Sequence, residues 1–193
     1  MTNDKNVLRK EMREKLKKIS CKTLEENSKI VAEKTLELEC VKNAKKICVY
    51  LNFSSEIITD NLIEKLLELN KEIFVPKIVS DSEMKAVRFY KKDDFFLDKY
   101  GIRTPKSDDK GQDFDVILMP LLAVDKSGRR LGRGKGYYDR FLNGEVRAKK
   151  VVLCHQIQVV ERVPFDNFDK KVDIIVTEEN TILVSEWKGV LYG

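Results

Sequence analysis

Hydrophobic and polar residues follow two different periods along the chain, and these periods predict helices and strands. Apolar residues at helical spacing predict helices over residues 4–19 and 60–69. A further helix is expected to begin after Thr23, which has capping-box spacing to Glu26. Short runs of apolar residues, or of alternating apolar and polar residues, predict strands. The predicted strands cover residues 47–51, 73–75, 86–90, 116–119, 151–154, 174–176 and 182–184.

This alternation of helices and strands predicts the fold class. It is typical of an α/β fold with a mainly parallel sheet. We therefore expect residues 1–193 to form a single domain, with a central sheet flanked by helices in a Rossmann-like three-layer architecture. Ligands of such sheets bind beyond the carboxyl ends of the strands. Glu56 and the stretch after residue 119 follow strands, whereas Asp173 precedes one, so strand geometry alone does not place Asp173 in a site.

The most distinctive polar stretch follows the apolar run 116–119. Residues 125–142 read DKSGRRLGRGKGYYDRFL, in which three alternating glycines are interleaved with Arg and Lys. Glycine lets the backbone approach a ligand closely, and free amides at a helix start favour anions. The stretch thus predicts a phosphate-binding loop that leads into a short helix near Gly136. Its spacing matches neither the Walker A nor the dinucleotide-binding pattern, and a solvated basic turn is the alternative.

Composition narrows the class of protein further. The chain carries 37 basic and 32 acidic residues, a net charge of +5, which permits an anionic ligand without demanding nucleic acid. Its four cysteines contain no Cys-x-x-Cys pair, which argues against zinc and favours reduced thiols. The start of the chain does not resemble a signal peptide, and no apolar run has the roughly 18 residues of a membrane span. We therefore expect a cytoplasmic protein with no membrane partner.

His155 is the one histidine of the chain, and it closes the apolar run 151–154. No Gly-x-Ser-x-Gly motif precedes it, so a Ser-His-Asp triad has little support. A structural role at the end of a strand is favoured over catalysis.

Residues 130–140, RLGRGKGYYDR, resemble the signature of the 5-formyltetrahydrofolate cyclo-ligase family. Weaker matches fall in the same order over nearly the whole chain. They are Lys5-x-x-Leu-Arg9, Leu51 through Glu56 with Thr59, Val75-Pro76-Lys77, Tyr100-Gly101-Ile102 with Pro105, Asp125-x-x-Gly128, Gln156, and Asp169-x-x-x-Asp173 with Thr177-Glu178. The chain departs from the family pattern at Thr104, Val124 and Phe168, all outside the glycine motif.

The resemblance implies an enzyme of folate one-carbon metabolism. It implies that ATP, with Mg²⁺, phosphorylates the formyl oxygen of 5-formyltetrahydrofolate, and that ring closure then gives 5,10-methenyltetrahydrofolate, ADP and phosphate. The implied ATP-binding residues are Lys5, Arg9, Arg130, Leu131, Gly132, Arg133, Gly134, Lys135, Gly136, Tyr137 and Tyr138. The implied folate-binding residues are Leu51, Glu56, Tyr100, Arg133, Gly134, Lys135, Gly136 and Tyr137. Asp139 and Asp173 are implied to hold Mg²⁺, no residue is assigned as a general base, and a monomer is expected.

Without the resemblance, the same residues have simpler interpretations. Lys5 and Arg9 would lie on a solvated helix face, Asp139 would form a salt bridge within its helix, and Asp173 would cap a strand. Two other functions also stay open on the residues alone. One is a single-stranded nucleic-acid module that uses the basic and aromatic residues of the glycine stretch, and the other is a phosphosugar enzyme or nucleotide sensor on a similar sheet.

Overall fold

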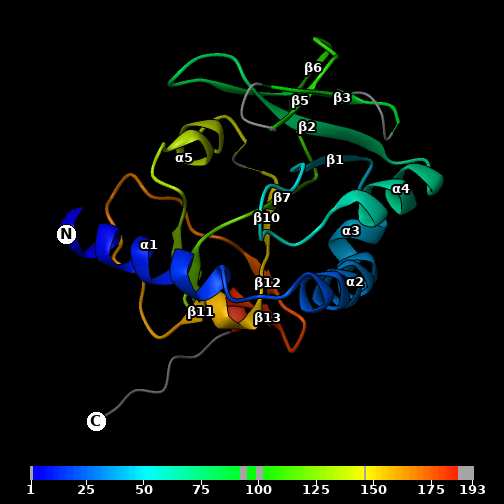
Figure 1. The fold of residues 1–193 in the computed structure, drawn as a ribbon. Helices are drawn as coiled ribbons and strands as arrows, with labels where there is room; N and C mark the ends of the chain where they lie inside the picture. Colours follow the sequence, from blue (N-terminus) through cyan, green and yellow to red (C-terminus); the bar gives the residue numbers. More distant parts are fainter. Residues whose placement is uncertain (1, 92–94, 99–101, 146, 187–193) are drawn as a thin grey trace.

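The protein is built on a mainly parallel sheet, seen here in a computed structural model that describes residues 2–91, 95–98, 102–145 and 147–186. Within these ranges the sheet has eight strands, in the order β13-β12-β10-β7-β1-β2-β3-β6 (Figure 1). Its parallel strands are β1 (Lys46–Val49), β2 (Glu72–Ile78), β7 (Val116–Met119), β10 (Lys149–Leu153) and β12 (Ile174–Val176). The antiparallel strands β3 (Met84–Phe89), β6 (Lys110–Gly111) and β13 (Thr181–Leu183) lie at the two edges.

Helices lie on both sides of this sheet, which confirms the predicted α/β fold class. The helices α2 (Cys21–Glu37), α3 (Glu39–Asn43) and α4 (Asp60–Glu68) gather on one side (Figure 1). There Val31 of α2 and Leu66 of α4 belong to one buried cluster with the sheet residues Val49 and Leu118. The other face is covered by the short helix α5 (Tyr137–Phe141) and by extended segments, rather than by long helices.

The first helix, α1 (Thr2–Leu16), packs on a small second sheet instead of on the central one. This sheet consists of β8 (Ala123–Asp125), β9 (Arg130–Leu131) and β11 (Val159–Val160). Met12 and Leu16 of α1 are buried against Leu122, Leu131 and Val163. The packing brings α1 beside the segment that contains the alternating glycines. The remaining elements are the ribbon β4 (Phe95–Leu97) and β5 (Arg103–Pro105) and the 3₁₀ turns Gln156–Gln158 and Val184–Glu186.

Helix boundaries differ from the sequence-based prediction by one to three residues. The second helix begins at Cys21, because Ser20 has extended backbone and its Oγ accepts the amide of Thr23 over 3.1 Å. Ser20 therefore takes the N-cap position that the spacing of Thr23 had indicated. The first helix ends at Leu16, three residues before the predicted end. None of the helices in the described ranges is long and apolar enough to cross a membrane.

Candidate active site

A cavity of about 780 Å³ lies at the carboxyl edge of the central sheet. Tyr50 and Leu51, which follow β1, line it together with Ile78 of β2 and with Pro120 and Leu121, which follow β7. From β1 the chain first adds β2 and β3 on one side, and later adds β7, β10 and β12 on the other side, so the direction in which strands are added reverses between β1 and β7. Open α/β sheets bind ligands at such a reversal, and the volume lies in the usual range for small-molecule sites.

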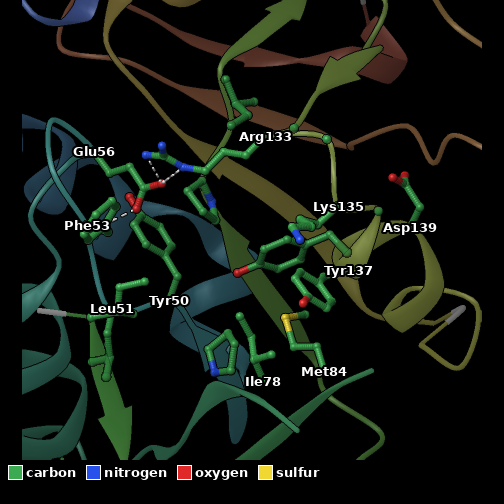
Figure 2. A pocket seen from close by; sticks show the side chains of 18 of the residues that line it. Tyr50, Leu51, Phe53, Glu56, Ile78, Met84, Arg133, Lys135, Tyr137 and Asp139 are labelled. Carbon is green, nitrogen blue, oxygen red and sulfur yellow. Dashed lines mark hydrogen bonds and ion pairs between the residues drawn. The ribbon is translucent and has the colours of Figure 1, made fainter. Parts of the chain in front are cut away.

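The glycine-rich segment forms one wall of this cavity (Figure 2). Gly134 and Gly136 have φ angles of 110° and 67°, which residues with a Cβ rarely adopt. A Cβ on Gly136 would also lie 2.8 Å from Nη1 of Arg140. Helix α5 begins directly after this turn, at Tyr137. The backbone course therefore needs glycine at these positions, and the predicted loop into a short helix is confirmed.

Glu56 and Arg133 form an ion pair at the cavity (Figure 2). Nη2 and Nε of Arg133 donate to Oε1 of Glu56 over 2.8 and 3.0 Å, and the amide of Phe53 donates to Oε2 over 2.9 Å. The side chain of Glu56 is only 11% exposed. Burial raises the pKa of Glu56, and the charge of Arg133 opposes this shift. The cavity thus offers a carboxylate whose cationic partner is itself exposed.

Arg130 and Asp139 form a second ion pair along the same wall. Nη2 of Arg130 donates to Oδ1 of Asp139 over 2.7 Å, and the amide of Lys170 donates to the same oxygen over 3.2 Å. The Arg130 side chain is 3% exposed, and its buried Nε has no hydrogen-bond partner within the described part of the chain. Burial lowers the pKa of Arg130, whereas Asp139 raises it. An arginine guanidinium stays protonated in proteins, so the pair remains ionic.

Helix α1 adds two cations to the cavity. Nζ of Lys5 lies 2.7 Å from Oδ2 of Asp166 and 2.5 Å from Oδ2 of Asp169. Burial by itself lowers the pKa of Lys5, but the hydrogen bonds to Asp166 and Asp169 outweigh it and the pKa is raised. Nε of Arg9 donates to the Gly132 carbonyl over 3.1 Å. The face of α1 that carries Lys5 and Arg9 therefore packs on the site instead of facing bulk solvent.

Most of the predicted site residues come together in this cavity. Those that line it are Lys5, Arg9, Leu51, Glu56, Arg130, Leu131, Gly132, Arg133, Gly134, Lys135, Gly136, Tyr137, Tyr138 and Asp139. The side chain of Leu131 points into the core, where the residue is 2% exposed. Tyr100, the remaining predicted folate contact, lies outside the described residues.

The structure does not bring Asp173 to Asp139. Asp173 directly precedes β12, and its Oδ2 accepts the amide of Lys150 over 2.8 Å at the opposite, amino edge of the sheet. The two carboxylates that were predicted to share a metal ion therefore lie at opposite edges of the sheet, and their shared role stays a prediction. The acid that lines the cavity is Asp169, four residues earlier. Its only signal in the sequence was its place in the matched pattern Asp169-x-x-x-Asp173.

Sequence reasoning missed the apolar wall of the cavity. This wall comes from β2, β3 and the segment around β5, and it includes Pro76, Ile78, Met84, Ile102 and Pro105. Ile78 is 55% exposed although it is a large aliphatic residue. Pro76, Ile102 and Pro105 fell within the weaker family matches but received no role there, and Ile78 and Met84 carry no motif, because any apolar strand end could supply them. Thr104, a departure from the family pattern, also lines the cavity, whereas Val124 is buried and Phe168 is exposed.

A mainly parallel sheet with a charged cavity at its point of strand reversal is the arrangement of an α/β enzyme. The model of the 5-formyltetrahydrofolate cyclo-ligase family matches residues 1–178. The chain is 34% identical to the probable 5-formyltetrahydrofolate cyclo-ligase of Caenorhabditis elegans, over 93% of this chain and 95% of that protein. It is 29% identical to the 5-formyltetrahydrofolate cyclo-ligase of Mus musculus, over 91% of this chain and 94% of that protein.

Solved structures agree with these sequence relatives. The NMR structure of 5,10-methenyltetrahydrofolate synthetase from Aquifex aeolicus superposes with a TM-score of 0.84 at 30% identity, covering 97% of this chain and 96% of that one. The corresponding synthetase of Mycoplasma pneumoniae gives a TM-score of 0.75 at 25% identity, covering 91% of this chain and 99% of that one. The chain belongs to the 5-formyltetrahydrofolate cyclo-ligase family.

Proposed function

We propose that this enzyme uses ATP and Mg²⁺ to convert 5-formyltetrahydrofolate to 5,10-methenyltetrahydrofolate, with release of ADP and phosphate. The observation that carries this proposal is the single cavity wall in which Glu56–Arg133 and Arg130–Asp139 flank a glycine-rich backbone. Such a wall combines groups that can form hydrogen bonds to a polar heterocycle with groups that can bind phosphate. Family membership supports the folate as the substrate.

The nucleotide phosphates are proposed to lie along the glycine segment. Arg9 and Arg130 present guanidinium groups there, and Lys135 is an exposed cation on the same segment. Nε of Arg130, which is buried and has no hydrogen-bond partner among the described residues, supports this assignment, because a buried donor without an acceptor costs roughly 1–3 kcal/mol that a bound anion can recover. Lys5 would leave its carboxylate partners for a phosphate oxygen when ATP binds.

Asp139 and Asp169 fit the metal ion that the family requires. Both carboxylates line the cavity, and Mg²⁺ is usually held by one or two carboxylates together with substrate phosphates. No group of three His, Cys, Asp or Glu side chains that could hold a metal by itself is found among the described residues, which agrees with such a shared site. A bound Mg²⁺ would neutralise charge on the transferring phosphoryl group.

The folate is proposed to bind between Glu56 and the apolar wall. A carboxylate accepts hydrogen bonds from the amino and ring N–H groups of a pterin, and Glu56 is available for this because Arg133 is its only side-chain partner among the described residues. Leu51 and Met84 would contact the flat ring. Tyr100 remains a predicted contact outside the described residues.

With the folate and the nucleotide bound in this way, the formyl group would lie between the two halves of the cavity. The formyl oxygen is a poor leaving group until ATP phosphorylates it. The second folate nitrogen then attacks the activated carbon, the ring closes, and phosphate leaves. In phosphoryl transfer the protein mainly positions the reacting groups and neutralises charge. The Arg and Lys side chains of the wall are proposed to do both. No residue is assigned as the proton acceptor.

A spectroscopic assay tests the proposal. Purified protein is mixed with 5-formyltetrahydrofolate, ATP and Mg²⁺, and the near-ultraviolet band of the methenyl product is followed. We expect the band to rise only when both ATP and Mg²⁺ are present. A folded protein that still binds ATP but gives no rise would point to a nucleotide-dependent relative with another substrate.

A further inference from the structure

The loop that carries Glu56 contains a strained turn. Ser54 has a φ of 55°, a conformation that residues with a Cβ adopt rarely and at some cost. Within the turn the amide of Glu56 donates to the Phe53 carbonyl over 3.3 Å, and the amide of Phe53 donates to the Glu56 carboxylate over 2.9 Å. Strained backbone persists only where neighbouring groups hold it in place. The direction of the Glu56 carboxylate therefore depends on what anchors this loop.

His155 provides an anchor from the other half of the sheet. It lies just beyond β10, after Cys154, it is fully buried, and its Nε2 lies 3.2 Å from the carbonyl oxygen of Ser55. Its other ring nitrogen, Nδ1, lies 3.0 Å from Nδ2 of Asn27 on α2. A carbonyl can only accept, so Nε2 carries the proton and Nδ1 accepts from the Asn27 amide. Both ring nitrogens are thus used in one tautomer.

The backbone that carries the imidazole is also held in place. The backbone amide of His155 donates to Oε1 of Gln158 over 2.8 Å, and Nε2 of Gln158 donates to the Leu121 carbonyl over 2.7 Å. Burial lowers the pKa of His155, although the Ser55 carbonyl and the charge of Glu178 oppose this shift. The neutral ring that the two hydrogen bonds require is therefore the favoured form.

We propose that His155 is a positioning residue for folate. By holding the Ser55 carbonyl, it fixes the strained turn and so directs the Glu56 carboxylate into the cavity. His155 is not among the residues that line the cavity, so it acts through the loop and not by touching the substrate. The inference rests on the proposed function, in which Glu56 binds the pterin ring. It also gives a reason for the buried histidine that the mechanism itself does not use.

Two substitutions at His155 test this role. His155→Phe keeps an aromatic ring, although a somewhat larger one, and removes both nitrogens, whereas His155→Gln keeps an amide nitrogen near the position of Nε2. For His155→Phe we expect the KM for 5-formyltetrahydrofolate to rise about tenfold, which corresponds to about 1.4 kcal/mol. The KM for ATP should stay within about twofold, a split that a general loss of packing would not produce. His155→Gln should recover most of the lost folate affinity.

A readout without any ligand tests the structural half of the inference. Hydrogen exchange at the amides of Phe53 and Glu56, which both donate within the turn, should become faster in His155→Phe. Val152→Ala is the matched control, because Val152 is fully buried in β10 and belongs to the core cluster on the opposite face from Val49. It should lower the melting temperature without changing either the folate KM or this exchange.

The possible outcomes separate the inference from the proposed function. Unchanged exchange in His155→Phe, or faster exchange with an unchanged folate KM, would overturn the positioning role. If His155→Phe does not fold, Asn27→Ala replaces it, since Asn27 is only partly buried and fixes the tautomer. In that variant an intermediate rise in the folate KM supports the role, and no rise overturns it. A wild-type protein without ATP-dependent turnover of the folate would overturn the proposed function, and that result is known before any variant is compared.

Discussion

The two edges of the central sheet use acidic residues in opposite ways. At the amino edge, Oδ2 of Asp115 accepts the amides of Lys45 and Lys46 over 2.7 and 2.9 Å, and Asp173 accepts the amide of Lys150. Asp115 directly precedes β7 and holds the start of β1, while Asp173 directly precedes β12 and holds the start of β10. Each of these carboxylates joins two neighbouring parallel strands.

At the carboxyl edge the acids also accept backbone amides, but each of them forms in addition a close ion pair with a cationic side chain, whereas Nζ of Lys150 lies 4.0 Å from Asp173 at the amino edge. Glu56 binds Arg133, Asp139 binds Arg130, and Asp169 binds Lys5. A side-chain cation can turn toward a ligand, whereas a strand amide cannot leave its partner without disrupting the sheet. A carboxylate that pairs closely with a cationic side chain is thus a better candidate for ligand binding than one that holds strand amides. Its position near the end of a strand is a weaker guide.

The largest expected effect comes from a substitution at the carboxyl edge. Asp139→Asn removes the charge that pairs with Arg130 and that is proposed to hold Mg²⁺, so turnover should fall by roughly a hundredfold or more. Folate binding should largely survive, because Glu56 and the apolar wall are unchanged. Initial rates of methenyl formation and equilibrium dialysis with the folate measure the two quantities. Wild-type turnover in this variant would contradict the metal role of Asp139.

A second substitution at the same edge should act on substrate affinity. Glu56→Gln removes a buried carboxylate that accepts charge-assisted hydrogen bonds, each worth about 1.5–3 kcal/mol. We expect the KM for 5-formyltetrahydrofolate to rise about tenfold and the KM for ATP to change little. Steady-state kinetics with each substrate varied in turn checks this. Equal increases in both KM values would show that Glu56 only supports the wall as a whole.

The matching substitution at the amino edge should change stability and not catalysis. Asp173→Ala removes the acceptor of the Lys150 amide, so the free energy of unfolding should fall by about 1 kcal/mol. Turnover should stay within about twofold of wild type. Urea unfolding and the methenyl assay measure the two effects. A loss of turnover as large as that of Asp139→Asn would restore Asp173 as a metal ligand and remove the distinction between the edges.

The smallest expected effect is a pH dependence that originates at His155. Burial lowers the pKa of His155 in the folded state, so the unfolded chain takes up a proton first, near its ordinary pKa of about 6.5. The stabilising contribution of the neutral ring is therefore complete above about pH 6.5 and declines as the pH falls from there to the lowered folded value. In urea unfolding at pH 7.5 and 5.5, wild type should lose more stability than His155→Gln. Equal losses of stability in the two proteins would show that His155 does not contribute to the pH dependence of unfolding.

The sequence identified the glycine stretch and the general fold correctly, for local reasons. The period of the hydrophobic residues distinguishes strands from helices without any knowledge of packing, and the alternating glycines can be read directly from the sequence. It also placed Glu56 at the end of a strand and favoured a structural role for His155, which its complete burial and two ring hydrogen bonds support. Boundaries were less accurate, since the capping group at α2 is a single serine hydroxyl.

Local sequence pattern was therefore enough to predict the alternating α/β fold, the glycine-rich wall and, through family resemblance, the set of residues around it. Which acids face the cavity depends instead on the folded arrangement. Asp169 and Asp173 are four residues apart, yet one pairs with Lys5 across 164 residues of sequence and the other holds the start of β10. Spacing along the chain does not report which edge of a sheet a side chain reaches. That choice depends on contacts between distant segments, which form only when the chain folds.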